Sequence, residues 1–336
     1  MSIGRWLRQV RSALDARASE PVRLPWGPPT TDWPRNAGLE SALRRHPRNP
    51  VALSIYADWL MEEGDVRGSV LAAALAGQTE AAVWGARYLT PGAALEGWML
   101  GPFAETLEIG PRHADRLQHE PFAYPACAIT RTLRMFAPPA AAARILEARQ
   151  APCPIEQLVV GVGFEGLEPV WATLGDIREL RVEKARDLGA IRAPRLESLA
   201  LGSVARAAWT DLASASLPAL QSLELAEVPD DPGPAFSAAI TALPVLGALH
   251  VRRTASAGLV QRLVEGGAGA RVRTLTLPGA RLDAVHALMH RADDLPALEQ
   301  LTLPAMTRAA DRRELVQAFG GRIALTWTPR SVLLAR

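Results

Sequence analysis

The sequence has few cysteines, and this scarcity excludes a disulfide-stabilised fold and a CxxC metal-binding protein. Cys127 and Cys153 are the only two in 336 residues. Two cysteines form no disulfide framework, and these belong to no CxxC metal motif. Cys127 lies in an apolar run, where a thiol is more often buried and inert than catalytic. A chain with so few cysteines suits a reducing compartment, so we expect a cytoplasmic protein.

Long apolar runs and a dominant charge are also lacking. No run approaches the ~20 apolar residues that a membrane-spanning helix needs, and the first twenty residues lack the continuous apolar segment of a secretory signal. The formal net charge is +2, which gives no reason to expect a nucleic-acid partner. Nearly all basic residues are arginines, and Lys184 is the only lysine. We interpret this preference for arginine as a compositional bias of the source.

Catalytic and cofactor motifs are missing as well. The sequence has no GxSxG, no P-loop and no GxGxxG after a strand. His286 and His290 stand four residues apart, a spacing that can place two metal ligands on one helix face. They have no obvious third ligand, so we interpret them as ordinary helix surface. We predict no catalytic residue, no metal and no cofactor.

The composition nevertheless indicates a folded chain with more than one domain. Hydrophobic residues make up 49% of it, and 336 residues suit two domains, or one domain and a repeat array. Periodicity and proline content divide the chain into an amphipathic N-terminal helix at 1–20, a proline-rich linker at 21–37, a helical domain at 38–90, a connecting or capping region at 91–153 and a repeat array at 154–336.

The N-terminal segment has helical periodicity, with apolar residues on one narrow stripe. Five prolines then interrupt regular structure in the linker. The helix could pack on its own domain, dock on a partner or lie on a membrane surface, although its narrow stripe argues against a membrane role. The candidate partner-binding residues here are Ile3, Trp6, Leu7, Val10, Trp26 and Trp33.

Short helices are predicted next. Asn49 and Pro50 form a helix start, and Gly64 and Asp65 separate that helix from the following one. Another helix is expected from Thr79 to about Pro91. Asp58 is polar amid apolar neighbours; we expect it to cap or brace the helical hairpin rather than to act in a functional site, and we expect Trp59 to be largely buried.

The segment LESALRRHPRNPVALSIYADWLMEEGDVRG (39–68) resembles the bacterial repeat-companion domain, whose signature is a YADWL-type helix followed by an acidic turn and GDxRG. Here the signature runs from Tyr56 to Gly68. Ser69 and Val70 depart slightly from the family, which usually continues with a long hydrophobic and an acidic residue. The resemblance implies a domain that precedes repeat arrays, often leucine-rich ones, and it implies no catalytic residue.

A repeated pattern follows, in which an aliphatic residue, two variable residues, Leu, one variable residue and an aliphatic residue recur. The central residues are Leu158, Leu180, Leu199, Leu223, Leu249, Leu275 and Leu301, with a degenerate eighth segment ending at Trp327. Their spacing is the leucine-rich-repeat period. A degenerate first segment could contain Leu107 and Ile109.

This pattern predicts an α/β leucine-rich-repeat solenoid, with parallel strands on its concave side and helices on its convex side, preceded by the N-terminal α-helical domain. Helical periodicity marks the segments 234–243, 256–266, 282–292 and 309–320. The Asn or Cys that usually follows each strand is absent, so the turn backbone must be satisfied by peptide groups or water, and we expect a somewhat irregular solenoid.

Outward positions of the predicted strands form the candidate interface. They carry mixed charges without a basic stripe, which argues against phosphate binding. The concave candidates are Arg181, Ser198, Ser222, Glu224, His250, Arg252, Thr274, Thr276, Gln300 and Thr302. The sequence thus favours a non-catalytic intracellular scaffold or adaptor that binds an unknown protein partner. The alternative is an accessory subunit of an enzyme or defence complex whose activity needs another partner.

Overall fold

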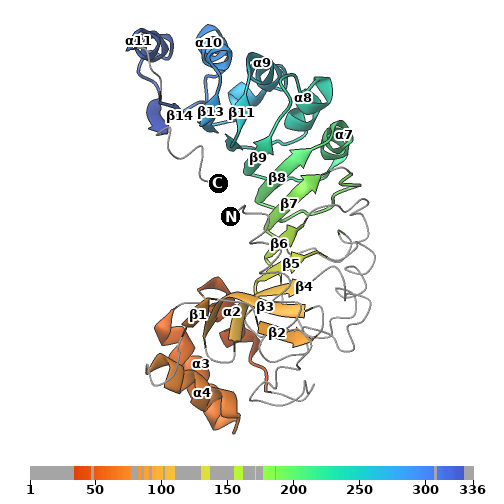
Figure 1. Cartoon of the computed structure of the whole chain (residues 1–336), viewed down its shortest axis with the longest axis vertical. Helices are drawn as coiled ribbons and strands as arrows, with labels where there is room; N and C mark the ends of the chain where they lie inside the picture. Colours follow the sequence, from red (N-terminus) through yellow and green to blue (C-terminus); the bar gives the residue numbers. More distant parts are fainter. Residues whose placement is uncertain are drawn as a thin grey trace, which may run out of the picture. The chain divides into compact units, whose positions relative to one another are not determined.

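The computed structural model describes residues 34–46, 49–76, 82–84, 87–90, 93–100, 103–109, 130–136, 155–161, 171, 177–185, 187–305 and 309–328 (Figure 1). The chain divides into two compact units, with unit 1 ending at Ile155 and unit 2 beginning at Glu156. The predicted N-terminal helix and most of the linker lie outside the described residues, and so do the candidates Ile3, Trp6, Leu7, Val10, Trp26 and Trp33.

Among its described residues, unit 1 contains three helices, and the second and third begin where the sequence predicts. They are α2 (Ala37–Arg45), α3 (Pro50–Glu62) and α4 (Val66–Leu75). The side chain of Asn49 accepts hydrogen bonds from the first backbone amides of α3, and Asp65 accepts one from Arg67 at the start of α4. Gly64 has a φ of 74°, which allows the sharp turn between the two helices. The predicted helix limits at Asn49 and Gly64 are therefore confirmed.

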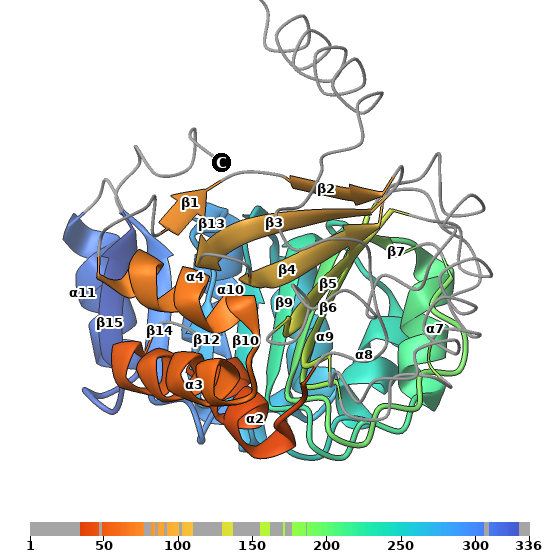
Figure 2. The ribbon, with the colours of Figure 1, turned by 90° about the horizontal axis from the view of Figure 1, so that it is seen from below.

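The signature residues hold α3 and α4 together. Tyr56, Ala57 and Leu60 are buried in the core of these helices, and α3 and α4 lie side by side in Figures 1 and 2. At Gly68, an added Cβ would lie 2.6 Å from the carbonyl oxygen of Ala57. Only glycine permits this close approach of the two helices without a shift of backbone.

A buried carboxylate links α2 to α3. Glu40 has no exposed surface, and the guanidinium of Arg35 donates hydrogen bonds to both of its oxygens. The hydroxyl of Tyr56 donates to Oε1 of Glu40 over 3.4 Å. Burial, and then the negative charge of Glu40, raise the pKa of Tyr56 above its usual value. The buried charge of Glu40 is thus compensated by hydrogen-bonding partners within unit 1, as a buried charge requires.

The described residues in the rest of unit 1 form strands, so the prediction of a helical domain that extends to residue 90 is wrong. The strands are β1 (Ala82–Trp84), β2 (Arg87–Thr90), β3 (Ala93–Leu100), β4 (Phe103–Ile109) and β5 (Thr132–Met135). The helix expected from Thr79 to Pro91 is wrong, because β1 and β2 both pair antiparallel with β3. Aromatic and β-branched residues there fit a sheet better than a helix. Leu107 is buried in β4, which pairs parallel with β5.

Unit 2 is a mixed α/β structure built on a parallel sheet. Its main strands are β6 (Gln157–Val160), β7 (Glu179–Ala185), β8 (Ser198–Val204), β9 (Ser222–Glu227), β10 (Ala248–Val251), β12 (Thr274–Thr276), β14 (Gln300–Pro304) and β15 (Ala324–Thr328). Each pairs in parallel with the next in this order, and the predicted central leucines lie opposite one another from Leu158 to Leu325. The predicted chain-order parallel sheet is confirmed for these strands.

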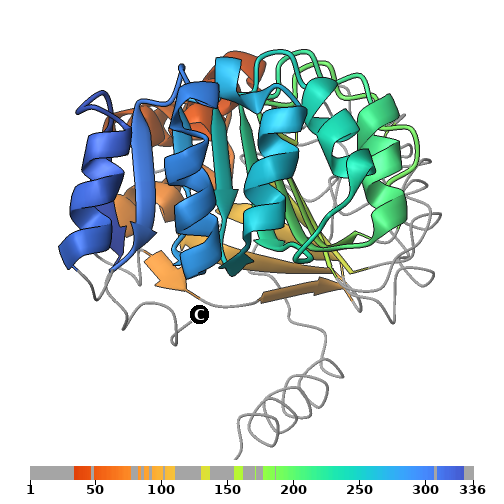
Figure 3. The same ribbon diagram turned by 90° about the horizontal axis from the view of Figure 1, so that it is seen from above.

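Helices cover one face of this sheet. They are α7 (Arg206–Ser214), α8 (Pro234–Thr241), α9 (Ala257–Glu265), α10 (Leu282–His290) and α11 (Ala309–Ala318). Figure 3 shows them in a row, with the strands behind them. The central leucines from Leu158 to Leu301 are buried. Trp209 and Phe236, on neighbouring helices, meet edge to face with ring centroids 4.9 Å apart. The four predicted helical segments are confirmed, whereas α7 was not predicted.

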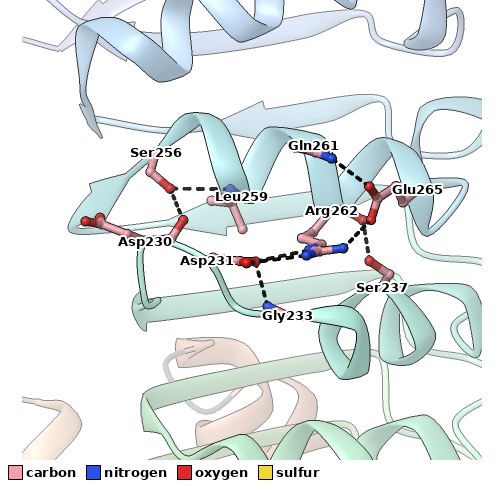
Figure 4. A network of polar contacts seen from close by, with 9 residues as sticks. All are labelled: Asp230, Asp231, Gly233, Ser237, Ser256, Leu259, Gln261, Arg262 and Glu265. Atoms are coloured by element: carbon pink, nitrogen blue, oxygen red, sulfur yellow. Dashed lines mark hydrogen bonds and ion pairs between the residues drawn. The ribbon is translucent and has the colours of Figure 1, made fainter.

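Polar contacts also join neighbouring strand–helix segments, and Figure 4 shows one such network. Arg262 of α9 binds Asp231, which precedes α8, with 3.0 Å between Nε and Oδ1. The hydrogen bond from Arg262 is the main cause that lowers the pKa of Asp231. Backbone amides of Arg252 and Arg253 donate to the carbonyls of Leu225 and Ala226. Peptide groups thus satisfy part of the turn backbone, as predicted in the absence of the Asn ladder.

Candidate functional site

The sheet of unit 2 has a second face, which points away from its helices and which we call the sheet face. It consists of the outward residues of β7 to β14, because side chains alternate along each strand. One row runs straight across the strands, since each member lies opposite the next in the pairing: Arg181, Ala200, Glu224, His250, Thr276 and Thr302. These residues are half-buried or exposed.

All ten predicted concave residues are outside the core. Arg181, Arg252 and Gln300 are exposed, and Ser198, Ser222, Glu224, His250, Thr274, Thr276 and Thr302 are half-buried. Ser198 lies opposite Ser222 in the pairing of β8 with β9, and Thr274 lies opposite Gln300 in the pairing of β12 with β14. The structure therefore places the predicted candidates on one side of one sheet.

Three of these candidates interact closely. Arg252 Nε lies 2.6 Å from Glu224 Oε1, and His250 is opposite Glu224 in the pairing of β10 with β9. Burial lowers the pKa of His250; the negative charge of Glu224 opposes this effect and the positive charge of Arg252 adds to it. The imidazole is therefore mostly neutral at pH 7, where it can both donate and accept a hydrogen bond.

The sheet face is hollowed where β7, β8 and β9 end. The hollow has a volume of about 270 Å³. Its lining combines charged side chains with small residues: Arg181, Glu183, Lys184, Ala200, Leu201, Gly202, Ser203, Glu224, Ala226, Glu227 and Arg253. We call it the strand-end hollow. It lies just below the roughly 300–1,000 Å³ of most small-molecule pockets, and one side chain fits within it.

A close approach of two backbones accompanies the strand-end hollow. An added Cβ at Gly202 would lie 2.0 Å from the carbonyl oxygen of Glu183, so no other residue fits there without a shift of β7. The pairing of β7 with β8 keeps its register around this point, with Val182 opposite Leu201 and Lys184 opposite Ser203. Gly202 also contributes no side chain, which leaves the hollow open.

Charges in the strand-end hollow are unevenly paired. Glu224 binds Arg252 and Glu227 binds Arg253. Among the described residues, the side chains of Arg181 and Lys184 form no ion pair or hydrogen bond. Both are exposed and therefore hydrated, so they are available to a ligand at little cost in broken contacts.

The sequence prediction missed part of the lining of this hollow. Lys184, Ser203, Glu227 and Arg253 lie beyond the outward strand positions that the repeat pattern selects. Their only signal in the sequence was the presence of the single lysine next to the end of a predicted strand. The close approach of Gly202 to Glu183 beside the hollow follows from packing that the pattern does not specify.

The described residues show no metal-binding cluster. They contain no group of three or more His, Cys, Asp or Glu side chains that could hold an ion. His286 and His290 are exposed on α10. Likewise, none of the helices in the described part of the chain is long and apolar enough to cross a membrane.

Asp58 differs from its prediction. It is exposed on α3, and its carboxylate has no hydrogen bond among the described residues, so it does not brace the hairpin. Trp59, expected to be largely buried, is only half-buried and stacks on Tyr56 with ring centroids 5.6 Å apart. Asp58 is exposed because Leu53, Tyr56, Ala57 and Leu60 form the buried side of the helix.

Comparisons with known proteins add little. No protein-family model matches the chain, and no curated protein matches it. Among solved structures, the crystal structure of a protein from Bacteroides fragilis is similar, with a TM-score of 0.49 and 14% sequence identity over 64% of this chain and 68% of that one. Similarity at this level carries no argument about family or function.

Proposed function

We propose that this chain is a non-catalytic, intracellular interaction scaffold that binds a protein partner through the sheet face of unit 2. The observation that carries the proposal is the row from Arg181 to Thr302, whose members lie opposite one another across consecutive strands and remain accessible. Strands paired on both sides hold this row in a fixed geometry, which reduces the entropy lost on binding.

The chemistry of the row favours protein over nucleic acid. Threonine hydroxyls at Thr276 and Thr302 follow a neutral histidine at His250 and an acidic Glu224. A nucleic-acid surface needs several cations along a phosphate backbone, whereas this row has one arginine, Arg181, and one acid, Glu224. Mixed charge and hydroxyl groups instead suit the polar contacts of a protein interface.

The proposal includes the repeat type and the companion domain. The spacing of the central leucines and the chain-order parallel pairing support a leucine-rich-repeat solenoid for residues 154–336. For the helical pair α3 and α4, support comes from the resemblance to the bacterial repeat-companion domain together with the roles of Gly64, Asp65 and Gly68 at the turn and contact.

Affinity purification from the native cell, followed by mass spectrometry and binding measurements with the purified partner, tests the proposal. The bait carries Ala200→Arg and Thr276→Arg, two bulky cations on the sheet face. The matched control carries Ala207→Arg and Thr210→Arg, at exposed positions of α7. We expect the sheet-face variant to lose a partner that the wild type and the control both retain. Equal retention by both variants would contradict the proposal.

A further inference from the structure

The lining of the strand-end hollow has as many cations as acids, but these charges are unevenly paired. Arg181, Lys184 and Arg253 line it, and Arg252 joins them through its ion pair with Glu224. Three acids oppose these four cations: Glu183, Glu224 and Glu227. Arg252, which lies outside the lining, binds Glu224, and Arg253 binds Glu227. The charges that remain are those of Arg181, Lys184 and Glu183, which leave a net of one positive charge.

We propose that the strand-end hollow binds the carboxylate of an aspartate or glutamate in an extended segment of the protein partner, with Arg181 and Lys184 as its cationic groups. This inference rests on the proposed function and specifies the chemistry that the sheet face recognises. Arg181 offers a planar fork that matches a carboxylate, and Lys184 adds a point charge beside it.

The lining also favours a peptide segment over an isolated ion. Ala200, Gly202 and Ala226 present little or no side chain, so a partner backbone can approach the sheet while its acidic side chain enters the hollow. From there, the row continues on the same face to His250 and Thr276. A segment that extends along this row meets hydrogen-bonding groups beyond the hollow.

Glu183 restricts which anions the hollow accepts. It lines the hollow between Arg181 and Lys184 in sequence and has no ion pair or hydrogen bond among the described residues. One carboxylate can be balanced by the two cations in spite of this acid. A polyphosphate brings several charges close together, so at least one of its oxygens would face Glu183 instead of a cation, and we expect a single carboxylate to fit the hollow better.

Lys184 makes a direct test possible, because it is the only lysine in the chain. An amine-reactive acetylating reagent therefore modifies Lys184 and the α-amino terminus, and peptide mapping separates the two. The probes are two capped, serine- and glycine-rich dodecapeptides that differ only in having two glutamates or two glutamines at the centre, and inorganic pyrophosphate at the same concentration.

We expect the glutamate peptide to slow acetylation of Lys184 at concentrations where the glutamine peptide and pyrophosphate do not, with the terminal amine unchanged. Arg181→Gln should remove this protection, while Arg313→Gln, at an exposed position of α11, should preserve it. Equal protection by both peptides, or protection by pyrophosphate as strong as that by the glutamate peptide, would overturn carboxylate recognition.

Binding of the purified partner then separates this inference from the proposed function. Arg181→Gln and Lys184→Gln should each weaken its affinity by about tenfold to a hundredfold, the range for a lost charge-assisted hydrogen bond. If both variants bind the partner normally while the Ala200→Arg, Thr276→Arg variant does not, the sheet face is the interface and the acidic contact is refuted. If that double variant also binds normally, the proposed function itself fails.

Discussion

Shortening Leu223 to alanine should destabilise unit 2 and leave unit 1 intact. Leu223 has no exposed surface, and in the sheet it lies between Leu199 of β8 and Leu249 of β10. Leu223→Ala removes three buried carbons, worth ~0.8 kcal/mol each on transfer to water, and leaves a cavity that rigid neighbours fill only in part. Together these effects should lower the free energy of unfolding by roughly 2–5 kcal/mol.

Amide hydrogen exchange followed by mass spectrometry is the suitable assay, because it reports on each unit separately. A loss of 2–5 kcal/mol corresponds to exchange faster by about 30-fold to about 4,000-fold for amides that exchange through unfolding of unit 2. The largest change should appear in β8, β9 and β10, since coupling in such an array is mainly between neighbours. The helices of unit 1, with their own core, should exchange as before.

Ser222→Ala is the matched control, because Ser222 adjoins Leu223 but is half-buried on the sheet face. It should change the free energy of unfolding by less than ~0.5 kcal/mol. Similar losses at positions 222 and 223 would refute the assignment of inward and outward residues. Faster exchange confined to β9 alone would refute the coupling between neighbouring strands.

Three further outcomes follow from single contacts. Gly68→Ala should lower the thermal stability of unit 1 by about 1–3 kcal/mol through the clash with Ala57, whereas Gly38→Ala, with only ordinary contact around it, should not lower it. Burial lowers the pKa of His250 in the folded state. The contribution of this histidine to stability is therefore complete above its unfolded pKa of about 6.5 and is lost as the pH falls through the lower folded pKa. His250→Gln should accordingly make the stability of unit 2, measured in denaturant titrations, less sensitive to acid. Asp58→Asn should change the free energy of unfolding by less than ~0.5 kcal/mol, since the carboxylate is exposed. A larger loss of stability would show that Asp58 braces the hairpin after all.

The parallel sheet could be predicted from the sequence because its cause is repeated. Each strand carries its inward leucine at the same place in the pattern, so an error at one position is corrected by the others. Helix α7 has a weaker signal: its only large buried side chains are Trp209 and Leu212, among alanines and polar residues. Packing of Trp209 against Phe236 of the next helix stabilises it, and that contact is not visible in local periodicity.

The failed predictions have different physical causes. Residues 79–91 include several alanines, which favour a helix locally, but pairing with β3 determines the structure of β1 and β2. Asp58 was expected to brace the hairpin because it is polar among apolar residues, yet its position on α3 directs it to solvent. The strand-end hollow depends on the close approach at Gly202, which no spacing rule encodes.

Chain-order pairing in unit 2 gives the protein a distinctive response to mechanical force. Strand β15 pairs with β14, β14 with β12 and β12 with β10, so a pull on the carboxyl end would detach strands from the edge in sequence. Leu249, Leu275 and Leu301 occupy equivalent sites, and 275 − 249 and 301 − 275 both equal 26 residues. At roughly 3.3–3.6 Å per extended residue, each such step releases about 90 Å of chain. Unit 2 would therefore lengthen under tension in nearly equal increments, and the strands nearest β6 would be the last to lose their partners.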